Sequence, residues 1–303
     1  MKTLNYSPSI LIFLLANSAV GQILAITTQP DLAFILRRIA GDEAKVESLT
    51  NGYQDLHLLR VRPSTLIKVR RADLFCQLGL DAEHAWVPPL LRKARNKKIR
   101  PGSIGFVNCS IGIKPLASVG GKSRSEAADL HPRGNPHYNL DPEQMRQAAR
   151  NILAALEKLR PASAPKFRKN ESAWEKELDH HLVAWKKRLL PFKGAGFIEY
   201  HSAWAYFAHR FDLRIAARME PRPGLAPTPG HLAQIIALGR TQKIGLVLSH
   251  PAKADLAKKV AREIGAKAVA LPISSTLHGP NSGYFAFMDH VVEIFATNLE
   301  KRQ

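Results

Sequence analysis

The sequence contains few cysteines and, beyond its first residues, no long hydrophobic run. Only Cys76 and Cys109 occur in 303 residues, which excludes a disulfide framework and a zinc module built on several cysteines. Both lie in apolar, strand-like segments, so one disulfide and two buried thiols are equally compatible with the sequence. No segment after the N-terminus is long and apolar enough to cross a membrane.

Sequence motifs for hydrolysis and for nucleic-acid recognition are also absent. The chain contains no His-Glu-x-x-His pair and no Gly-x-Ser-x-Gly nucleophile elbow. No helix-turn-helix, zinc-finger or RNP-type pattern organises its basic residues. We therefore predict neither an enzyme nor a nucleic-acid-binding protein.

Acidic residues are scarce relative to basic ones. Twenty-five Asp and Glu stand against 44 Lys and Arg, which gives a formal net charge of +19. The basic residues are spread along the chain, with one dense run at 92–100 (RKARNKKIR). This dispersed pattern favours a solvated basic surface, and contact with an acidic polymer is the alternative.

Residues 1–21 have the pattern of a secretory signal peptide. Lys2 supplies the positive charge, 10–15 (ILIFLL) the apolar core, and 19–21 (AVG) the small residues before a cleavage point at Gln22. The apolar core is too short to span a bilayer comfortably, which disfavours an uncleaved anchor. We expect the mature chain to be a soluble periplasmic protein.

Short apolar runs alternate with helical patterns along the rest of the chain. Alternation of this kind predicts parallel sheets covered by helices. The expected strands are 24–27, 45–49, 72–76, 104–109, 196–200, 213–219, 244–248 and 268–272. The expected helices are 31–38, 63–71, 85–94, 141–159, 172–190, 203–211, 229–238, 252–264 and 284–301.

The alternation is interrupted by one long helical pattern at 172–190. Trp174, Leu178 and Leu182 recur there at helical spacing, and the segment 161–167 before them has the composition of a break. We therefore predict an α/β fold of two lobes, each with a central, mainly parallel sheet flanked by helices, joined by the long helix. The N-terminal lobe is expected at 22–160, the linker and connecting helix at 161–193, and the C-terminal lobe at 194–303.

Three of the twelve histidines fall in loops near the ends of expected strands: His57, His137 and His201. Ligands of open α/β sheets bind at the carboxyl ends of the strands, so a two-lobed fold can bring these side chains together. Three neutral imidazoles with one open or carboxylate-filled position suit a zinc ion. The pattern alone has little specificity, because twelve histidines form many chance triplets.

The segments around these histidines resemble a known family. Four stretches carry the resemblance: GYQDLHLLRVRPSTLIKVRRADLFCQLGL (52–80), GNPHYNLDPEQMRQAARNI (134–152), YHSAWAYFAHRFDL (200–213) and MEPRPGLAPTPGHLAQII (219–236). In order and spacing they are similar to the zinc/manganese solute-binding proteins of metal ABC importers. The resemblance extends from about residue 26 to the C-terminus. It implies two α/β lobes bridged by a long helix, with the metal ion between them.

The resemblance also implies a ligand set. His57 matches the ligand histidine of an Asp-Pro-His element, although Leu56 replaces the proline, and His137 matches that of an Asn-Pro-His element. His201 occupies a third position that is histidine in zinc-type members and typically glutamate in manganese-type members. Zn²⁺ is therefore the expected ion, with Mn²⁺ or Fe²⁺ as alternatives. Glu220 is expected near the cleft as a support for the site rather than a ligand.

The chain departs from the family pattern at the fourth ligand. The family places an aspartate two residues before the tyrosine of the C-terminal helix, and Ser282 occupies that place before Tyr284. The fourth position is therefore expected to be filled by water, His278 or Ser282. A weakened metal site is the alternative.

The function that the resemblance implies is delivery of zinc to the permease of an ABC importer in the inner membrane. The protein is expected to act in the periplasm as a monomer. The alternative is a protein that kept the fold without transport, as a periplasmic metal chaperone or an adhesion-type binding module.

Overall fold

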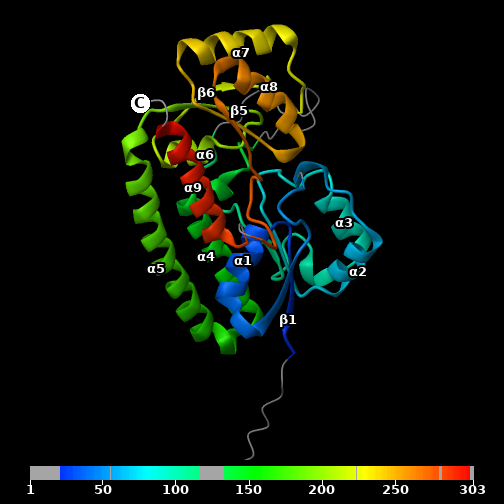
Figure 1. Ribbon diagram of the computed structural model, residues 1–303. Helices are drawn as coiled ribbons and strands as arrows, with labels where there is room; N and C mark the ends of the chain where they lie inside the picture. Colours follow the sequence, from blue (N-terminus) through cyan, green and yellow to red (C-terminus); the bar gives the residue numbers. More distant parts are fainter. Residues whose placement is uncertain (1–20, 55, 117–132, 223, 280–281, 301–303) are drawn as a thin grey trace, which may run out of the picture.

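Two parallel sheets, covered by helices and bridged by one long helix, form the protein (Figure 1). The computed structural model describes residues 21–54, 56–116, 133–222, 224–279 and 282–300. The predicted signal peptide falls almost entirely on residues 1–20, outside this described part. Among the described helices, none is both long and apolar enough to cross a membrane. The two-lobed α/β class predicted from the sequence is confirmed.

The N-terminal sheet has four parallel strands in the order β2-β1-β3-β4. Buried β-branched and aromatic side chains such as Ile26 and Phe75 favour the strand conformation. The strands are β1 Ile23–Thr27, β2 Ala44–Ser48, β3 Leu74–Gln77 and β4 Phe106–Asn108, and the helices around them are α1 Pro30–Ala40, α2 Pro63–Arg71, α3 Val87–Ala94 and α4 Pro142–Leu159. Because the strands are parallel, their carboxyl ends meet at one edge of the sheet.

The C-terminal sheet repeats this topology in the order β6-β5-β7-β8. Its strands are β5 Gly196–Glu199, β6 Arg214–Arg218, β7 Leu246–Ser249 and β8 Lys267–Ala270, and its helices are α6 Ala205–Arg210, α7 Pro229–Thr241 and α8 Ala254–Ile264. In both sheets the strand that comes first in the sequence lies between the second and the third. The strand order therefore changes direction beside it, which is where ligands bind in such folds.

The long helix α5, Ala164–Leu189, begins eight residues earlier than the sequence predicted. The break expected at 161–167 is too long, because Pro165 lies in the first turn, where a missing N–H leaves no helical hydrogen bond unmade. α5 packs on α1, on α4 and on the C-terminal helix α9, Tyr284–Glu300. Figure 1 shows α9 between α5 and α1, so the end of the chain returns to the helices of the N-terminal half. The lobe boundaries stay a prediction.

The two cysteines are free thiols, buried at neighbouring strand ends. Cys76 lies in β3, and Cys109 directly follows β4. Burial raises the pKa of the Cys109 thiol, and the adjacent Cys76 raises it further. Of the two alternatives that the sequence left open, the structure therefore has the buried thiols.

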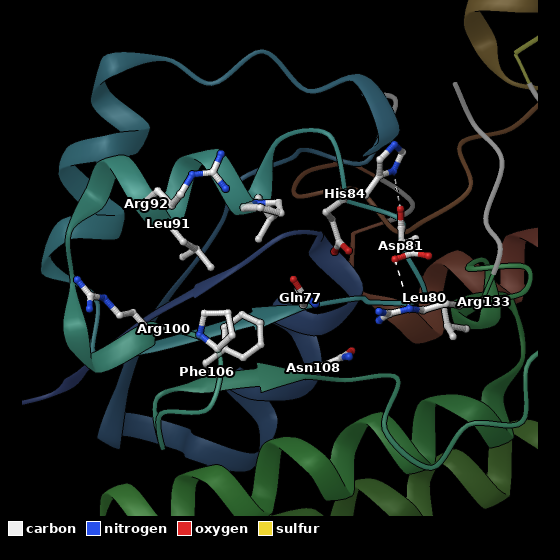
Figure 2. Close-up of a pocket in the computed structure, with 14 residues that line it drawn as sticks. Gln77, Leu80, Asp81, His84, Leu91, Arg92, Arg100, Phe106, Asn108 and Arg133 are labelled. Carbon is white, nitrogen blue, oxygen red and sulfur yellow. Dashed lines mark hydrogen bonds and ion pairs between the residues drawn. The ribbon is translucent and has the colours of Figure 1, made fainter. Parts of the chain in front are cut away.

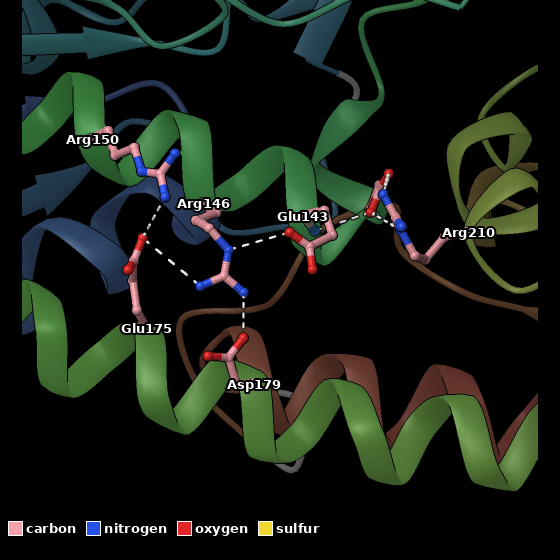
Figure 3. A network of polar contacts seen from close by, with 7 residues as sticks. Glu143, Arg146, Arg150, Glu175, Asp179 and Arg210 are labelled. Carbon is pink, nitrogen blue, oxygen red and sulfur yellow. Dashed lines mark hydrogen bonds and ion pairs between the residues drawn. The ribbon is translucent and has the colours of Figure 1, made fainter.

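A group of ion pairs connects α4 to α5 (Figure 3). The guanidinium of Arg146 lies 3.2 Å from Glu143, 3.8 Å from Glu175 and 2.5 Å from Asp179. Arg150 is a second partner of Glu175, at 3.2 Å. Because Arg146 is largely buried while Asp179 is exposed, this network fixes α4 against α5 at the edge of the core rather than inside it.

Replacing Arg210 by Met is expected to destabilise the protein by about 3 kcal/mol, because it leaves a buried carboxylate without its cation. Arg210 of α6 contacts both oxygens of Asp141, at 2.6 and 3.0 Å, and the Asp141 side chain is 1% exposed. Arg150→Met is the matched control, since it removes a mostly exposed contact that is expected to contribute less than about 1 kcal/mol. Urea unfolding of both variants measures the difference. Equal losses would contradict a special contribution of the buried pair.

Candidate metal centre

Three histidines from distant parts of the chain meet between the two sheets. The ligand nitrogens of His57, His137 and His201 all lie within 4.8 Å of one another. His57 and His137 are 3% and 2% exposed, and the His201 side chain is 19% exposed. His57 follows β2, His137 follows β4 and His201 follows β5, so the cluster lies where the carboxyl ends of both sheets converge.

His57 is held by the turn that follows β3. It belongs to a short 3-10 helix, Leu56–Leu58, and its Nδ1 donates to the carbonyl oxygen of Ala82 at 3.0 Å. The indole N–H of Trp86 donates to the carbonyl oxygen of Leu56 at 2.7 Å. Since a carbonyl oxygen only accepts, the hydrogen of neutral His57 resides on Nδ1 and Nε2 is the basic nitrogen. A basic ring nitrogen is what a metal ion requires.

The buried carboxylate of Glu83 shapes that turn. It accepts hydrogen bonds from the hydroxyl of Thr28 at 2.6 Å and from the backbone N–H groups of Leu78 and Gly79 at 2.6 and 3.0 Å. Burial raises the pKa of Glu83, while these hydrogen bonds lower it. The contacts tie the ends of β1 and β3 together and fix the position of Ala82, the hydrogen-bond partner of His57.

His137 lies on a segment that is bonded to the C-terminal lobe. Its backbone N–H donates to Oδ1 of Asn135 at 2.9 Å. The amide of Asn135 donates to the carbonyl oxygen of Ser202 at 2.8 Å, and the hydroxyl of Tyr206 donates to the carbonyl oxygen of Asn135 at 2.8 Å. These hydrogen bonds fix His137 relative to the loop that carries His201.

A carboxylate orients His201. Its Nδ1 lies 2.7 Å from Oε2 of Glu220, whose side chain is 9% exposed. The carboxylate accepts from Nδ1–H, so Nε2 of neutral His201 is basic, and it lies 3.2 Å from Nε2 of His137. A hydrogen on His137 or a shared cation satisfies this pair of nitrogens. Glu220 therefore lies beside the cluster, and its supporting role at a metal site stays a prediction.

Glu199, the last residue of β5, stabilises the loop that carries His201 by hydrogen bonds. Its carboxylate accepts from the backbone N–H of Trp204 at 3.0 Å and from Nε of Arg218 at 2.6 Å. Burial raises the pKa of Glu199, and Arg218 lowers it. Sequence reasoning missed both Glu199 and Glu83, because their partners are backbone groups and the single side chains of Arg218 and Thr28, which form no sequence motif.

The fourth-ligand candidates from the sequence lie apart from the three nitrogens. His278 is exposed and is not part of the cluster. Ser282 is exposed, and its hydroxyl donates to the carbonyl oxygen of Leu277 at 3.2 Å. Within the described residues, the cluster contains no carboxylate. The described part of the chain therefore supplies three imidazoles at this place.

This donor set fits a divalent first-row metal ion. Imidazole is a common ligand of zinc, and three protein ligands with one open position occur at zinc sites that exchange their fourth ligand. Iron also accepts imidazole, whereas manganese prefers oxygen ligands. The hydrogen bonds from Nδ1 of His57 to a carbonyl and of His201 to a carboxylate are those that metal-bound histidines usually make.

A cavity of about 330 Å³ lies beside the cluster, with His57 and His201 in its wall. The wall is completed by residues that follow the carboxyl ends of the strands of the C-terminal sheet, with Tyr53 from the N-terminal lobe. These residues include Tyr200 and Glu220 after β5 and β6, Ser249, His250 and Lys253 at and after β7, and Ile273 after β8. The candidate metal centre is therefore open to a small chamber whose wall is mostly apolar and carries a few polar groups.

A larger cavity of 810 Å³ lies in the N-terminal lobe beside α3 (Figure 2). Arg92 and Arg100, the two ends of the dense basic run, line it together with Arg133, which lies 3.8 Å from Asp81. Its described lining includes none of the three clustered histidines. It is therefore separate from the candidate metal centre.

The fold and the cluster together define a two-lobed α/β protein with a metal-binding geometry between its sheets. Residues 26–298 match the family model described as ZnuA, zinc-uptake complex component A, periplasmic. The chain therefore belongs to this family, which confirms the resemblance seen in the sequence. Because the family is one of solute-binding proteins, the prediction that the chain is not an enzyme is confirmed as well.

The curated relatives are similar over most of this chain. The zinc-binding lipoprotein AdcA of Streptococcus pneumoniae is 25% identical over 259 residues, which cover 85% of this chain and 51% of AdcA, so the chain spans about half the length of that relative. The high-affinity zinc uptake system protein ZnuA of Yersinia pestis is 27% identical, covering 77% of this chain and 74% of its own. The iron-binding protein YfeA of the same organism is 24% identical, covering 89% and 84%.

Solved structures share the fold. A crystal structure of ZnuA superposes with a TM-score of 0.77 at 23% identity, covering 92% of this chain and 99% of that one. A manganese-bound periplasmic metal-binding protein from Candidatus Liberibacter asiaticus gives a TM-score of 0.75 at 22% identity, with the same coverage. At these identities the likeness establishes the architecture, and the choice of metal has to be argued from the site.

Proposed function

We propose that the protein binds a divalent metal ion, zinc in the first place, and delivers it to the permease of an ABC importer. The observation that carries this proposal is the convergence of His57, His137 and His201 within 4.8 Å, at the carboxyl ends of strands from both sheets. In this proposal the three histidines are the ligands and the ion is the cargo. Membership of a zinc-uptake family supports the same role.

Zinc is favoured by the donor set. The described cluster consists of three imidazoles without a carboxylate, and nitrogen donors suit zinc better than the harder manganese ion. Relatives named for zinc binding and zinc uptake support this choice. The iron-binding relative and the manganese-bound neighbour in structure keep Fe²⁺ and Mn²⁺ as the alternatives.

The fourth coordination position is proposed to be filled from the solution. Of the candidates from the sequence, His278 and Ser282 are both exposed, so bringing either to the ion would require the loop before α9 to move. The cavity beside His57 and His201 gives water or another small donor access to this position.

The proposed place of action is the periplasm. The signal-peptide pattern of residues 1–21 and the family description both support it. The partner is then the permease of an ABC importer in the inner membrane, and the protein is expected to meet it as a monomer.

Release of the ion is proposed to depend on the turn that carries His57. His137 and His201 lie on segments that are joined by a hydrogen bond between Asn135 and Ser202. The two histidines are therefore expected to move together. His57 lies on a separate short turn, anchored to the loop after β3. Displacement of this turn would remove one ligand and open the cluster without a large rotation of the lobes.

Replacing Glu220 by Gln is expected to weaken zinc binding by about 10- to 100-fold. The neutral carboxamide oxygen accepts the hydrogen bond from Nδ1 of His201 more weakly than the charged carboxylate does, so it fixes the orientation of the ring less firmly. Competition with a chromophoric chelator measures the affinity. Glu263→Gln is the matched control, since this exposed carboxylate pairs with Arg240 and does not line the cavity. Equal affinities of the two variants would argue that Glu220 does not support a metal ligand.

Metal analysis of the protein purified from the periplasm tests the proposed function. One equivalent of zinc is expected, because three imidazoles form one site. Manganese or iron at that stoichiometry would replace zinc as the cargo. A metal-free protein that binds anionic polymers in a salt-sensitive manner would instead favour the adhesion-type alternative.

A further inference from the structure

The cavity beside His57 and His201 has polar groups that the three histidines do not use. Ser249 and Lys253 face it from the C-terminal lobe, next to Tyr200. Its volume of about 330 Å³ lies at the lower end of the range of roughly 300–1,000 Å³ for small-molecule sites. It therefore has room for a small organic ligand next to the metal centre.

Lys253 supplies a positive charge at this cavity. It ends a short 3-10 helix, Pro251–Lys253, that begins two residues after β7. Its ammonium lies 5.8 Å from the centroid of the Tyr200 ring, and it makes no ion pair with a carboxylate of the described residues. Its charge is therefore available to an anion in the cavity.

Ser249 supplies a hydroxyl that the described part of the protein does not satisfy. It is the last residue of β7 and is 4% exposed. Its Oγ has no hydrogen-bond partner among the described residues, although it is buried at the cavity wall. Buried hydroxyl groups are rarely left without a partner, because the loss of water is then uncompensated. A bound molecule in the cavity would satisfy it.

The charge balance of the chamber favours an anion. A divalent ion on three neutral imidazoles keeps both of its positive charges, and Lys253 adds another. Among the described residues that line the cavity, Glu220 is the one carboxylate, and it is bonded to Nδ1 of His201. With the metal ion bound, the net charge that an incoming carboxylate meets in the chamber is therefore positive.

We propose that this cavity is a carboxylate subsite. A small organic dicarboxylate binds there with one carboxylate at the open position of the metal ion and the other at Lys253 and Ser249. The inference rests on the proposed function, since it takes the three histidines as ligands. The cargo is then a metal–carboxylate complex rather than a bare ion.

Cobalt spectroscopy with malonate as the dicarboxylate tests this subsite. The protein is loaded with Co²⁺, whose visible absorption depends on its coordination number, and is titrated with malonate or with acetate. Malonate is expected to change the spectrum, with an affinity about tenfold lower in Lys253→Met because one charge-assisted contact is lost. Acetate has no second carboxylate, so its affinity should change less than about twofold in the same variant.

Two further variants sharpen the comparison. Ser249→Ala is expected to weaken malonate binding about threefold, since it removes a neutral hydrogen bond. Lys259→Met is the matched control, since Lys259 is an exposed lysine of α8 that does not line the cavity. This variant should bind malonate with the affinity of the native protein.

The outcomes separate the subsite from the proposed function. If Co²⁺ does not bind the native protein, the proposed function fails. If Co²⁺ binds but malonate leaves its spectrum unchanged or removes the ion, the subsite alone is contradicted. An equal loss of malonate affinity in Lys253→Met and Lys259→Met would also overturn it, because the effect would then come from general surface charge.

Discussion

Zinc affinity is expected to fall by about a thousandfold when His137 is replaced by Ala, more than the 10- to 100-fold that follows loss of a group that only orients a ligand. His137 is 2% exposed, and its Nε2 lies 3.2 Å from that of His201. Its removal would leave two protein ligands and a polar hole that water fills. Calorimetric titration of chelator-stripped protein measures the loss. His57→Ala and His201→Ala are expected to behave alike.

His290→Ala is the control for this series. His290 is an exposed residue of α9 and lies outside the cluster, so its removal should leave zinc affinity within about twofold of the native value. Circular dichroism of each variant establishes that the fold is retained. Native-like affinity of His137→Ala with the fold intact would show that the ion binds elsewhere.

Zinc binding is also expected to collapse on acidification. Each ligand must offer an unprotonated nitrogen, and the ordinary pKa of histidine is about 6.5. Below that value the affinity should fall by up to about tenfold per pH unit for each histidine that must lose a proton. Titrations at a neutral pH and at two acidic values check this slope. A pH-independent affinity would contradict histidine ligation.

Protonation of Asp31 at acidic pH does not destabilise the fold and therefore does not interfere with this test. Burial raises the pKa of Asp31 from 3.8 to about 6, although hydrogen bonds from Ser275 and Asn139 oppose the shift. Between these values the folded state binds more protons at Asp31 than the unfolded state does, so the contribution of this group to stability falls as the pH rises through the window. Acidification therefore stabilises the fold at Asp31, while it weakens metal binding at the histidines.

The sequence was informative about those site residues that lie in loops after strands. His57, His137 and His201 each follow a strand, and the parallel topology brings strand ends together, so their meeting could be anticipated. The family resemblance then singled them out among twelve histidines. The class of fold was predictable for the same reason, because alternating strands and helices have few packing solutions.

The sequence was less informative where a role depends on tertiary packing. The start of α5 was misplaced because Pro165 has the appearance of a break until its position in the first turn is known. Glu83 and Glu199 support the histidine loops by accepting backbone hydrogen bonds, a role that any buried carboxylate could fill. Ser249 and Lys253 line the same cavity as His57. Because His57 lies almost 200 residues earlier in the chain, no local sequence pattern connects it with these two residues.

X-ray absorption at the zinc edge of the loaded native protein tests the central claim most directly. Three imidazole nitrogens at about 2.0–2.1 Å are expected, with one further light atom in the fourth position. Imidazole is recognised by the outer atoms of its ring, so the histidines can be counted. A first shell dominated by oxygen, with fewer than two imidazoles, would contradict the assignment of His57, His137 and His201 as ligands.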